Sequence, residues 1–235
     1  MSMVLPCYLA MTKEEFTNTS PLPPKIGWMA CQFAPYGSGL SGLPEHLPPG
    51  FLIFLNDRIP PRNSDPDKIV RQLKDLCTRE KAAGLAVDFQ QPMNPEKEAI
   101  VKALSRDFPV SVAFSEICRC PGPVLLSPPP VRTALSSWLA PWKEREIWLD
   151  FSPGREYWEI TKAGARLLPD RPAPENAEFL QDSSLFCHYF PDVRPDAACF
   201  WIYRTEEDLR SLLREASRLG VKKAVGLYRE LSSCF

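Results

Sequence analysis

Few residues in this sequence can bind a metal ion. Only two histidines occur among 235 residues, His46 and His188. There are eight cysteines but no Cys-x-x-C pair, and only Cys118 and Cys120 lie close together along the chain. A zinc site would have to gather its ligands from distant segments. We therefore expect buried thiols and no metal ion.

Long runs of charged or apolar residues are also missing. The 28 basic and 29 acidic residues leave a formal charge of −1, and no basic run is long enough to bind a nucleic acid. No apolar run approaches the roughly 20 residues that a membrane span requires. Residues 1–11 lead directly into charged residues and lack the pattern of a secretion signal. We expect a cytoplasmic protein without a nucleic-acid or membrane partner.

Glycine is scarce and proline abundant, with 11 glycines against 26 prolines. Prolines gather between apolar segments, as in Pro128–Pro130, where a fixed φ and a missing N–H suit loops. Hydrophobic residues at 44% and aromatic residues at 11% are sufficient for a buried core. No internal repeat or low-complexity linker divides the chain. We expect one barrel-like domain over residues 1–235.

Short apolar segments typical of buried strands recur along the whole chain. Eight of them are Leu5–Met11, Ile26–Phe33, Phe51–Asn56, Gly84–Phe89, Val110–Phe114, Val124–Ser127, Ile147–Phe151 and Val221–Tyr228. Three more segments also have strand patterns, and they are Tyr157–Thr161, Leu185–Phe190 and Cys199–Tyr203. These three indicate hairpin insertions in the C-terminal third.

Three amphipathic helices separate some of these strands. They begin at the N-cap residues Asp65, Asn94 and Thr205, and the last ends at Gly220. Strands that alternate with helices predict parallel pairs joined by right-handed crossovers. The fold class is therefore α/β, and eight strands favour a (β/α)8-type (TIM) barrel over the alternative of an open doubly wound sheet.

The segment Ala83–Pro92 is the most informative stretch of the sequence. Side chains alternate along a strand. One face is apolar and suited to packing against helices, and it consists of Leu85, Val87 and Phe89. The other face directs Asp88 and Gln90 toward the barrel interior and its C-terminal mouth, where barrel enzymes carry their catalytic residues.

This segment resembles the fourth-strand signature of family 18 glycoside hydrolases, the chitinase type, which reads approximately Asp-Gly-Leu-Asp-Ile-Asp-Trp-Glu-Tyr-Pro. Six positions match or are closely replaced, and they are Gly84, Leu85, Val87, Asp88, Phe89 and Pro92. Two aspartates of the signature correspond to Ala83 and Ala86, and its catalytic glutamate corresponds to Gln90. The resemblance implies a barrel that recognises a carbohydrate.

In that family the glutamate protonates the glycosidic oxygen, while the neighbouring aspartate steers the N-acetyl group of the substrate. Gln90 can donate a hydrogen bond but cannot deliver a proton, so general acid catalysis of typically about 10²–10⁴-fold would be lost. Weaker resemblances cover Pro109–Ala113, like the fifth strand, and Ala224–Leu231, like the last, where Arg229 replaces the usual tryptophan. The same ending also resembles a group of bacterial proteins, which implies no function.

Other carboxylates near predicted strand ends could replace the missing acid. Glu116 follows the fifth strand and Glu230 follows the last, so either could form a catalytic pair with Asp88. Asp57 follows the third strand and is a candidate for ligand binding. A barrel places several carboxylates around its mouth in any case, so solvated loop acids remain the alternative.

Further candidates for ligand binding flank the same strand ends. Gln91 follows Gln90, while Tyr36 and Tyr228 are aromatic residues on which a sugar ring could stack. Trp148 and Trp201 are predicted to be core residues instead.

The segment Gly37–Gly42 has the G-x-G-x-x-G spacing of a dinucleotide loop. Prolines interrupt the residues that follow, so no helix can begin at the glycines to bind a pyrophosphate. We interpret the segment as a rim loop and expect no cofactor. We interpret His188 as a packed histidine rather than a catalytic base.

Three hypotheses for function follow from the sequence. The first is a chitinase-like barrel that binds a carbohydrate near Asp88 and Gln90, with standard chitinase chemistry lost. The second is an active enzyme of another class that uses Asp88 with Glu116 or Glu230 on a small polar molecule. The third is a non-catalytic interaction module, which a side-chain-filled barrel mouth would favour.

Overall fold

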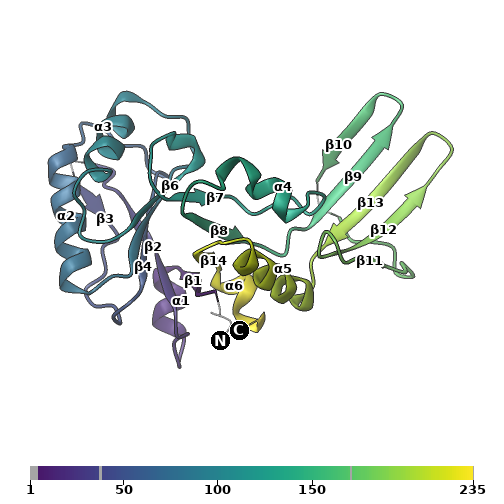
Figure 1. Ribbon diagram of the computed structural model, residues 1–235, viewed down its shortest axis with the longest axis horizontal. Coiled ribbons are helices and arrows are strands. Elements are labelled where there is room, and N and C mark those ends of the chain that lie inside the picture. The colour runs from purple at the N-terminus through teal and green to yellow at the C-terminus, as the bar shows by residue number, and fades with distance from the viewer. Residues whose placement is uncertain (1–4, 37–38, 170, 235) are drawn as a thin grey trace.

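Eight parallel strands close into a barrel in the computed structural model, which describes residues 5–36, 39–169 and 171–234. The first strand pairs with both the second and the last, so the sheet closes on itself. In order around the barrel (Figure 1), the strands are β1 (Cys7–Met11), β2 (Ile26–Phe33), β4 (Leu52–Asn56), β5 (Gly84–Asp88), β6 (Val112–Ser115), β7 (Val124–Leu126), β8 (Ile147–Phe151) and β14 (Lys223–Leu227). A short strand, β3 (Leu40–Ser41), pairs antiparallel with β2.

This architecture confirms the predicted α/β class and the (β/α)8-type barrel. All eight predicted segments form barrel strands, and their ends differ from the predictions by two residues or fewer. The alternative of an open sheet is wrong, because β1 joins the two edges. The barrel is irregular, because two of its connections have no α-helix among the described residues. The connection from β2 to β4 contains only the short strand β3, and the connection from β6 to β7 contains only a short 3-10 helix.

The three predicted helices are α2 (Pro66–Arg79), α3 (Pro95–Leu104) and α5 (Glu206–Arg218). The side chains of Asp65 and Asn94 cap α2 and α3, and a proline occupies the first helical position of each. Thr205 and Asp208 form a capping box at the start of α5. The shorter helical segments are α1 (Lys13–Asn18), η1 (Glu116–Cys118), α4 (Leu135–Leu139), η2 (Ala140–Trp142), α6 (Tyr228–Leu231) and η3 (Ser232–Cys234).

Alternation along the strands divides the core into layers. In β5, Leu85 and Val87 are buried with the apolar faces of α2 and α3, and Phe89 joins them just beyond the strand. Ala86 belongs instead to the cluster inside the barrel. That cluster consists of Tyr8, Ala10, Leu52, Phe54, Ala86, Ala113, Leu125, Trp148 and Val225. The sequence pattern therefore assigned the faces of β5 correctly.

Trp148 fills the barrel interior at the N-terminal ends of the strands, opposite the mouth. It is fully buried, and its indole reaches from β8 to β5, where a Cβ on Gly84 would lie 2.6 Å from Cη2. The Nζ atom of Lys223 lies 3.8 Å from the centre of the indole ring and donates a hydrogen bond to the carbonyl of Ala83. Gly84 is thus required by the close approach of Trp148, and these residues close the floor of the barrel.

A second sheet of five antiparallel strands is inserted between β8 and α5. Its strands are β9 (Glu156–Thr161), β10 (Gly164–Leu168), β11 (Leu180–Asp182), β12 (Cys187–Val193) and β13 (Ala197–Tyr203). Figure 1 shows this sheet as an arm that extends away from the barrel. The predicted hairpin insertions are confirmed, and β10 and β11 are additional strands.

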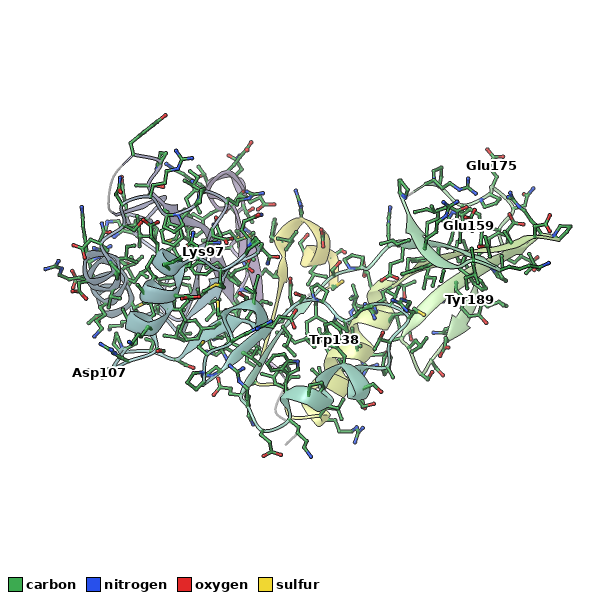
Figure 2. The ribbon with its side chains drawn as sticks, turned by 90° about the horizontal axis from the view of Figure 1, so that it is seen from above. Lys97, Asp107, Trp138, Glu159, Glu175 and Tyr189 are labelled. Atoms are coloured by element: carbon green, nitrogen blue, oxygen red, sulfur yellow. The ribbon has the colours of Figure 1, made fainter. Side chains whose placement is uncertain are left out.

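The inserted sheet has a small core of its own, in which the rings of Tyr157 and Trp201 lie 4.6 Å apart. Its two ends meet, because the N–H of Arg204 donates to the carbonyl of Pro153 at 2.8 Å. In Figure 2, Lys97 lies in the barrel half of the molecule, and Glu159 lies in the half that the insertion forms. That residues 1–235 form one domain stays a prediction.

Eight free thiols are present, and five of them are buried, whereas Cys7, Cys118 and Cys120 are half-buried. This agrees with the expected buried thiols. Within the described ranges, we find no helix with the length and apolar character that crossing a membrane would require.

Candidate functional site

A cavity of about 450 Å³ opens at the C-terminal ends of the barrel strands. This is the end at which barrel proteins bind their ligands. Its floor is apolar and includes Met29, Phe54 and Leu125, and its polar residues include Asp88, Gln90, Ser115, Glu116, Ser127 and Asp150. The cavity therefore brings together Asp88, Gln90 and Glu116 of the predicted site residues.

Asp88 is the last residue of β5, and its half-buried side chain lines the cavity. Gln90 lies just beyond the strand with its side chain exposed, and its Nε2 donates a short hydrogen bond to Oδ1 of Asp88. Burial raises the pKa of Asp88, and the hydrogen bond from Gln90 opposes this effect by stabilising the charged form. The amide thus fixes the orientation of the Asp88 carboxylate.

Sequence reasoning missed Asp150, which also lines the cavity. It lies near the end of β8, where Leu149 and Phe151 pack outward against the helices and Asp150 faces the interior. Burial, followed by the Asp88 carboxylate, raises the pKa of Asp150 to about 8. The available signal was one carboxylate at the end of an apolar strand, which is also the pattern around Asp88.

The two aspartates differ in how well each can carry a charge. Asp88 has the Gln90 amide as a hydrogen-bond donor, whereas Asp150 is stabilised by the backbone N–H of Phe151. Two nearby carboxyl groups in unlike surroundings can have pKa values that differ, so that one gives up its proton before the other. The raised pKa of about 8 favours the protonated form of Asp150 at neutral pH.

Asp57 is buried below the rim and does not line the cavity. Its carboxylate accepts hydrogen bonds from the backbone N–H groups of Gln90 and Gln91, at 2.9 and 3.0 Å, and forms an ion pair with the buried Lys97. Lys97 also donates to the carbonyls of Gln91 and Pro92, each at 3.1 Å. The pair holds the segment Phe89–Pro92 in place, so Asp57 acts on the site through this segment.

Ser115 holds the same segment from the opposite side. Its hydroxyl donates to the carbonyl of Phe89 at 2.9 Å and accepts from the N–H of Phe89 at 3.2 Å. The segment after β5 is therefore fixed by β4, β6 and α3 together, which makes the Asp88–Gln90 geometry rigid.

The remaining predicted site residues lie outside the lining of the cavity. Tyr36 is 96% exposed, and Gln91 is exposed next to Gln90. Tyr228 is half-buried and packs against core residues, while Glu230 acts on the cavity only through its electrostatic effect on Asp150.

Two motifs set aside in the sequence analysis fall away from the cavity. In Gly37–Gly42, the positions Gly37 and Ser38 lie outside the described residues, and Leu40 and Ser41 form β3 rather than a helix start. His188 is partly buried, and its Nδ1 lies 2.8 Å from Oδ2 of Asp208 on α5. This supports the interpretation of a packed histidine. No cluster of His, Cys, Asp and Glu in the described part of the chain could hold a metal ion.

The chain has the fold of a (β/α)8 barrel, and solved structures share this fold. The solved structures that it resembles include the spore cortex-lytic enzyme SleL of Bacillus cereus, with a TM-score of 0.53 and 10% sequence identity over 94% of this chain and 70% of that one. A chitinase from Chromobacterium violaceum gives a TM-score of 0.52 and 10% identity over 94% of this chain and 93% of the chitinase.

SleL of Bacillus megaterium is similar to the same degree, with a TM-score of 0.50 and 10% identity over 94% of this chain and 70% of that one. The sequence matches no protein-family model. It also matches no curated protein sequence. The similarities to the three solved structures concern the fold alone.

Proposed function

We propose that this protein is a family 18-like barrel that recognises a carbohydrate at the mouth of the barrel, with standard chitinase chemistry lost. The shared fold supports this proposal, and so does the cavity at the strand ends. The resemblance of Ala83–Pro92 to the fourth-strand signature also supports it, because Asp88 at the end of β5 and Gln90 just beyond it both line the cavity.

The observation that carries the proposal is the hydrogen bond from Gln90 to Asp88 at the cavity rim. A glutamate at this position would deliver a proton to a leaving oxygen, and an amide cannot. The amide can still orient Asp88 and donate a second hydrogen bond to a ligand hydroxyl. The arrangement is therefore suited to binding a sugar without protonating its glycosidic bond.

Calorimetric titration with chitooligosaccharides and with peptidoglycan fragments tests this proposal. We expect Asp88→Ala to weaken binding by about tenfold or more, because a hydrogen bond to a charged group contributes about 1.5–3 kcal/mol. Gln90→Glu should weaken binding as well, because an ionised glutamate cannot donate the hydrogen bond that orients Asp88. If no glycan on a broad array binds, and Asp88→Ala changes no measured property, the proposal fails.

A second candidate is an active enzyme of another class, and the unlike environments of Asp88 and Asp150 favour it. Asp88 would act as base on a small polar substrate, with Asp150 or Glu116, the other carboxyl groups that line the cavity, as acid. A turnover screen with Asp88→Asn as the inactive control tests this candidate. Activity that survives Asp88→Asn would rule it out. The open cavity is the feature that disfavours an interaction module without a ligand.

A further inference from the structure

The ionisable side chains that line the cavity are all acidic. Asp88, Glu116 and Asp150 supply three carboxyl groups, and the other described lining residues include no lysine, arginine or histidine. Most sites that bind anionic groups carry arginine, lysine or helix N-terminal N–H groups. The lining therefore disfavours ligands with a phosphate or carboxylate group.

The groups that face Asp150 from neighbouring elements reinforce this charge pattern. They are Asp88 on β5, Glu230 on α6 and the neutral thiol of Cys7 on β1, whose pKa burial raises to about 12. Two lysines lie in the barrel, but neither lines the cavity. Lys97 is paired with Asp57 behind the segment Phe89–Pro92, and Lys223 lies against Trp148 at the floor. Asp150 thus has no basic side chain as partner within the described lining.

The spacing of the acids favours an organic cation over a metal ion. No three acidic, cysteine or histidine side chains of the described residues converge closely enough to hold one metal. An ammonium group on a larger ligand needs fewer partners, because one ionised carboxylate and one hydrogen-bond acceptor can satisfy it. The apolar floor of Met29, Phe54 and Leu125 would meet the C–H face of a ring.

We propose that the cavity selects an amino sugar with a free, protonated amino group, a glucosamine unit, over the N-acetylated and the carboxylated sugars. This inference rests on the proposed function, because it assumes a carbohydrate in the cavity. The ammonium group binds between Asp88 and Asp150, and Gln90 orients Asp88 from the rim.

Proton release accompanies binding of such a ligand. A bound ammonium favours the charged form of Asp150, so its proton leaves when the ligand binds below about pH 8. The heat of binding then depends on the ionisation enthalpy of the buffer. A neutral sugar leaves Asp150 protonated and gives no such dependence.

The experiment is calorimetric titration at mildly acidic pH with two oligosaccharides of equal length, one of glucosamine and one of N-acetylglucosamine, each in two buffers of different ionisation enthalpy. We expect the glucosamine oligomer to bind roughly tenfold to a hundredfold more tightly. We also expect proton release with that oligomer alone. Asp150→Asn should remove the proton release and bring the two affinities together.

Glu144→Gln is the matched control, because it also removes one carboxylate but its side chain is 88% exposed and lies outside the cavity lining. It should behave as the unaltered protein. If N-acetylglucosamine oligomers bind as tightly as glucosamine oligomers, this inference is overturned and the proposed function stands. If neither binds and no other glycan does, both fail. Proton release in the unaltered protein decides the question even if Asp150→Asn does not fold.

Discussion

A single buried carboxylate, that of Asp57, fixes the rim of the cavity. We expect Asp57→Ala to lower the free energy of unfolding by about 3–5 kcal/mol, because it leaves the Lys97 ammonium buried without its partner. Denaturant unfolding measures the change. The double variant Asp57→Leu with Lys97→Met should be more stable than Asp57→Ala, since it buries no unpaired charge. A double variant less stable than Asp57→Ala would contradict this explanation.

Asp150 makes stability depend on pH in a direction set by its raised pKa. The ordinary value is 3.8 and the folded value about 8, so between these the unfolded chain has lost the proton that the folded chain keeps. The free energy of unfolding therefore falls as pH rises through this window, by at most about 1.4 kcal/mol per pH unit.

Urea unfolding at about pH 5 and about pH 8 measures this effect. Relative to the unaltered protein, Asp150→Asn should gain stability at the higher pH, because it has no proton to lose. Asp88 is present in both proteins, so its own titration largely cancels. An equal stability difference at the two pH values would show that the pKa of Asp150 is ordinary.

At the scale of single residues, the sequence identified Asp88 but not Asp150. Asp88 follows the alternating apolar residues Leu85 and Val87, and it lies in the segment that resembles the fourth-strand signature. Asp150 has the same local pattern in Ile147–Phe151, but burial beside another carboxylate is a property of the closed barrel. No local pattern contains it, since Asp88 and Asp150 lie 62 residues apart along the chain.

The elements depend on their caps as well as on their apolar faces. Thr205→Ala should lower the free energy of unfolding by about 1 kcal/mol, because the hydroxyl of Thr205 accepts the N–H of Asp208 at the start of α5. The same change at Thr12 is the control. It removes an equivalent cap from α1, a six-residue helix with no buried residue, so its effect should be smaller. Equal losses at both sites would show that capping alone sets the size of the effect.

Long amphipathic helices and apolar strands could be predicted from the sequence, but three strands could not. In β10, Gly164–Leu168, most residues are exposed, so no buried face leaves a pattern in the sequence. The strands β3 and β11 have two and three residues, too few for alternation to show. Their pairing with neighbouring strands, rather than their composition, makes them strands.

At the scale of the whole molecule, the barrel and the insertion should support one another. The insertion ends beside its own start, so Gly154–Tyr203 can be replaced by a short glycine linker between Pro153 and Arg204. We expect a folded barrel whose free energy of unfolding is lower by about 2–4 kcal/mol. The lost contacts include those of Glu156 with Val131 and of His188 with Asp208.

Circular dichroism, gel filtration and urea unfolding measure this change. A replacement that leaves the free energy of unfolding unchanged would make the insertion a separate domain, against the prediction of one domain. The number of strands predicted a closed barrel from the sequence. The arm-like projection of the inserted sheet depends on the junction near Pro153 and Arg204, which carries no signal in the sequence.

Because the floor of the barrel is closed, the cavity opens only at the mouth. Trp148 reaches across to Gly84 beneath the cavity, so no ligand can pass through the barrel from one end to the other. A polymer longer than the cavity can only rest across the mouth or insert one of its ends. A ligand that enters the cavity must leave by the same opening. A long chain that enters would therefore bind by one of its ends and could not be threaded through the barrel.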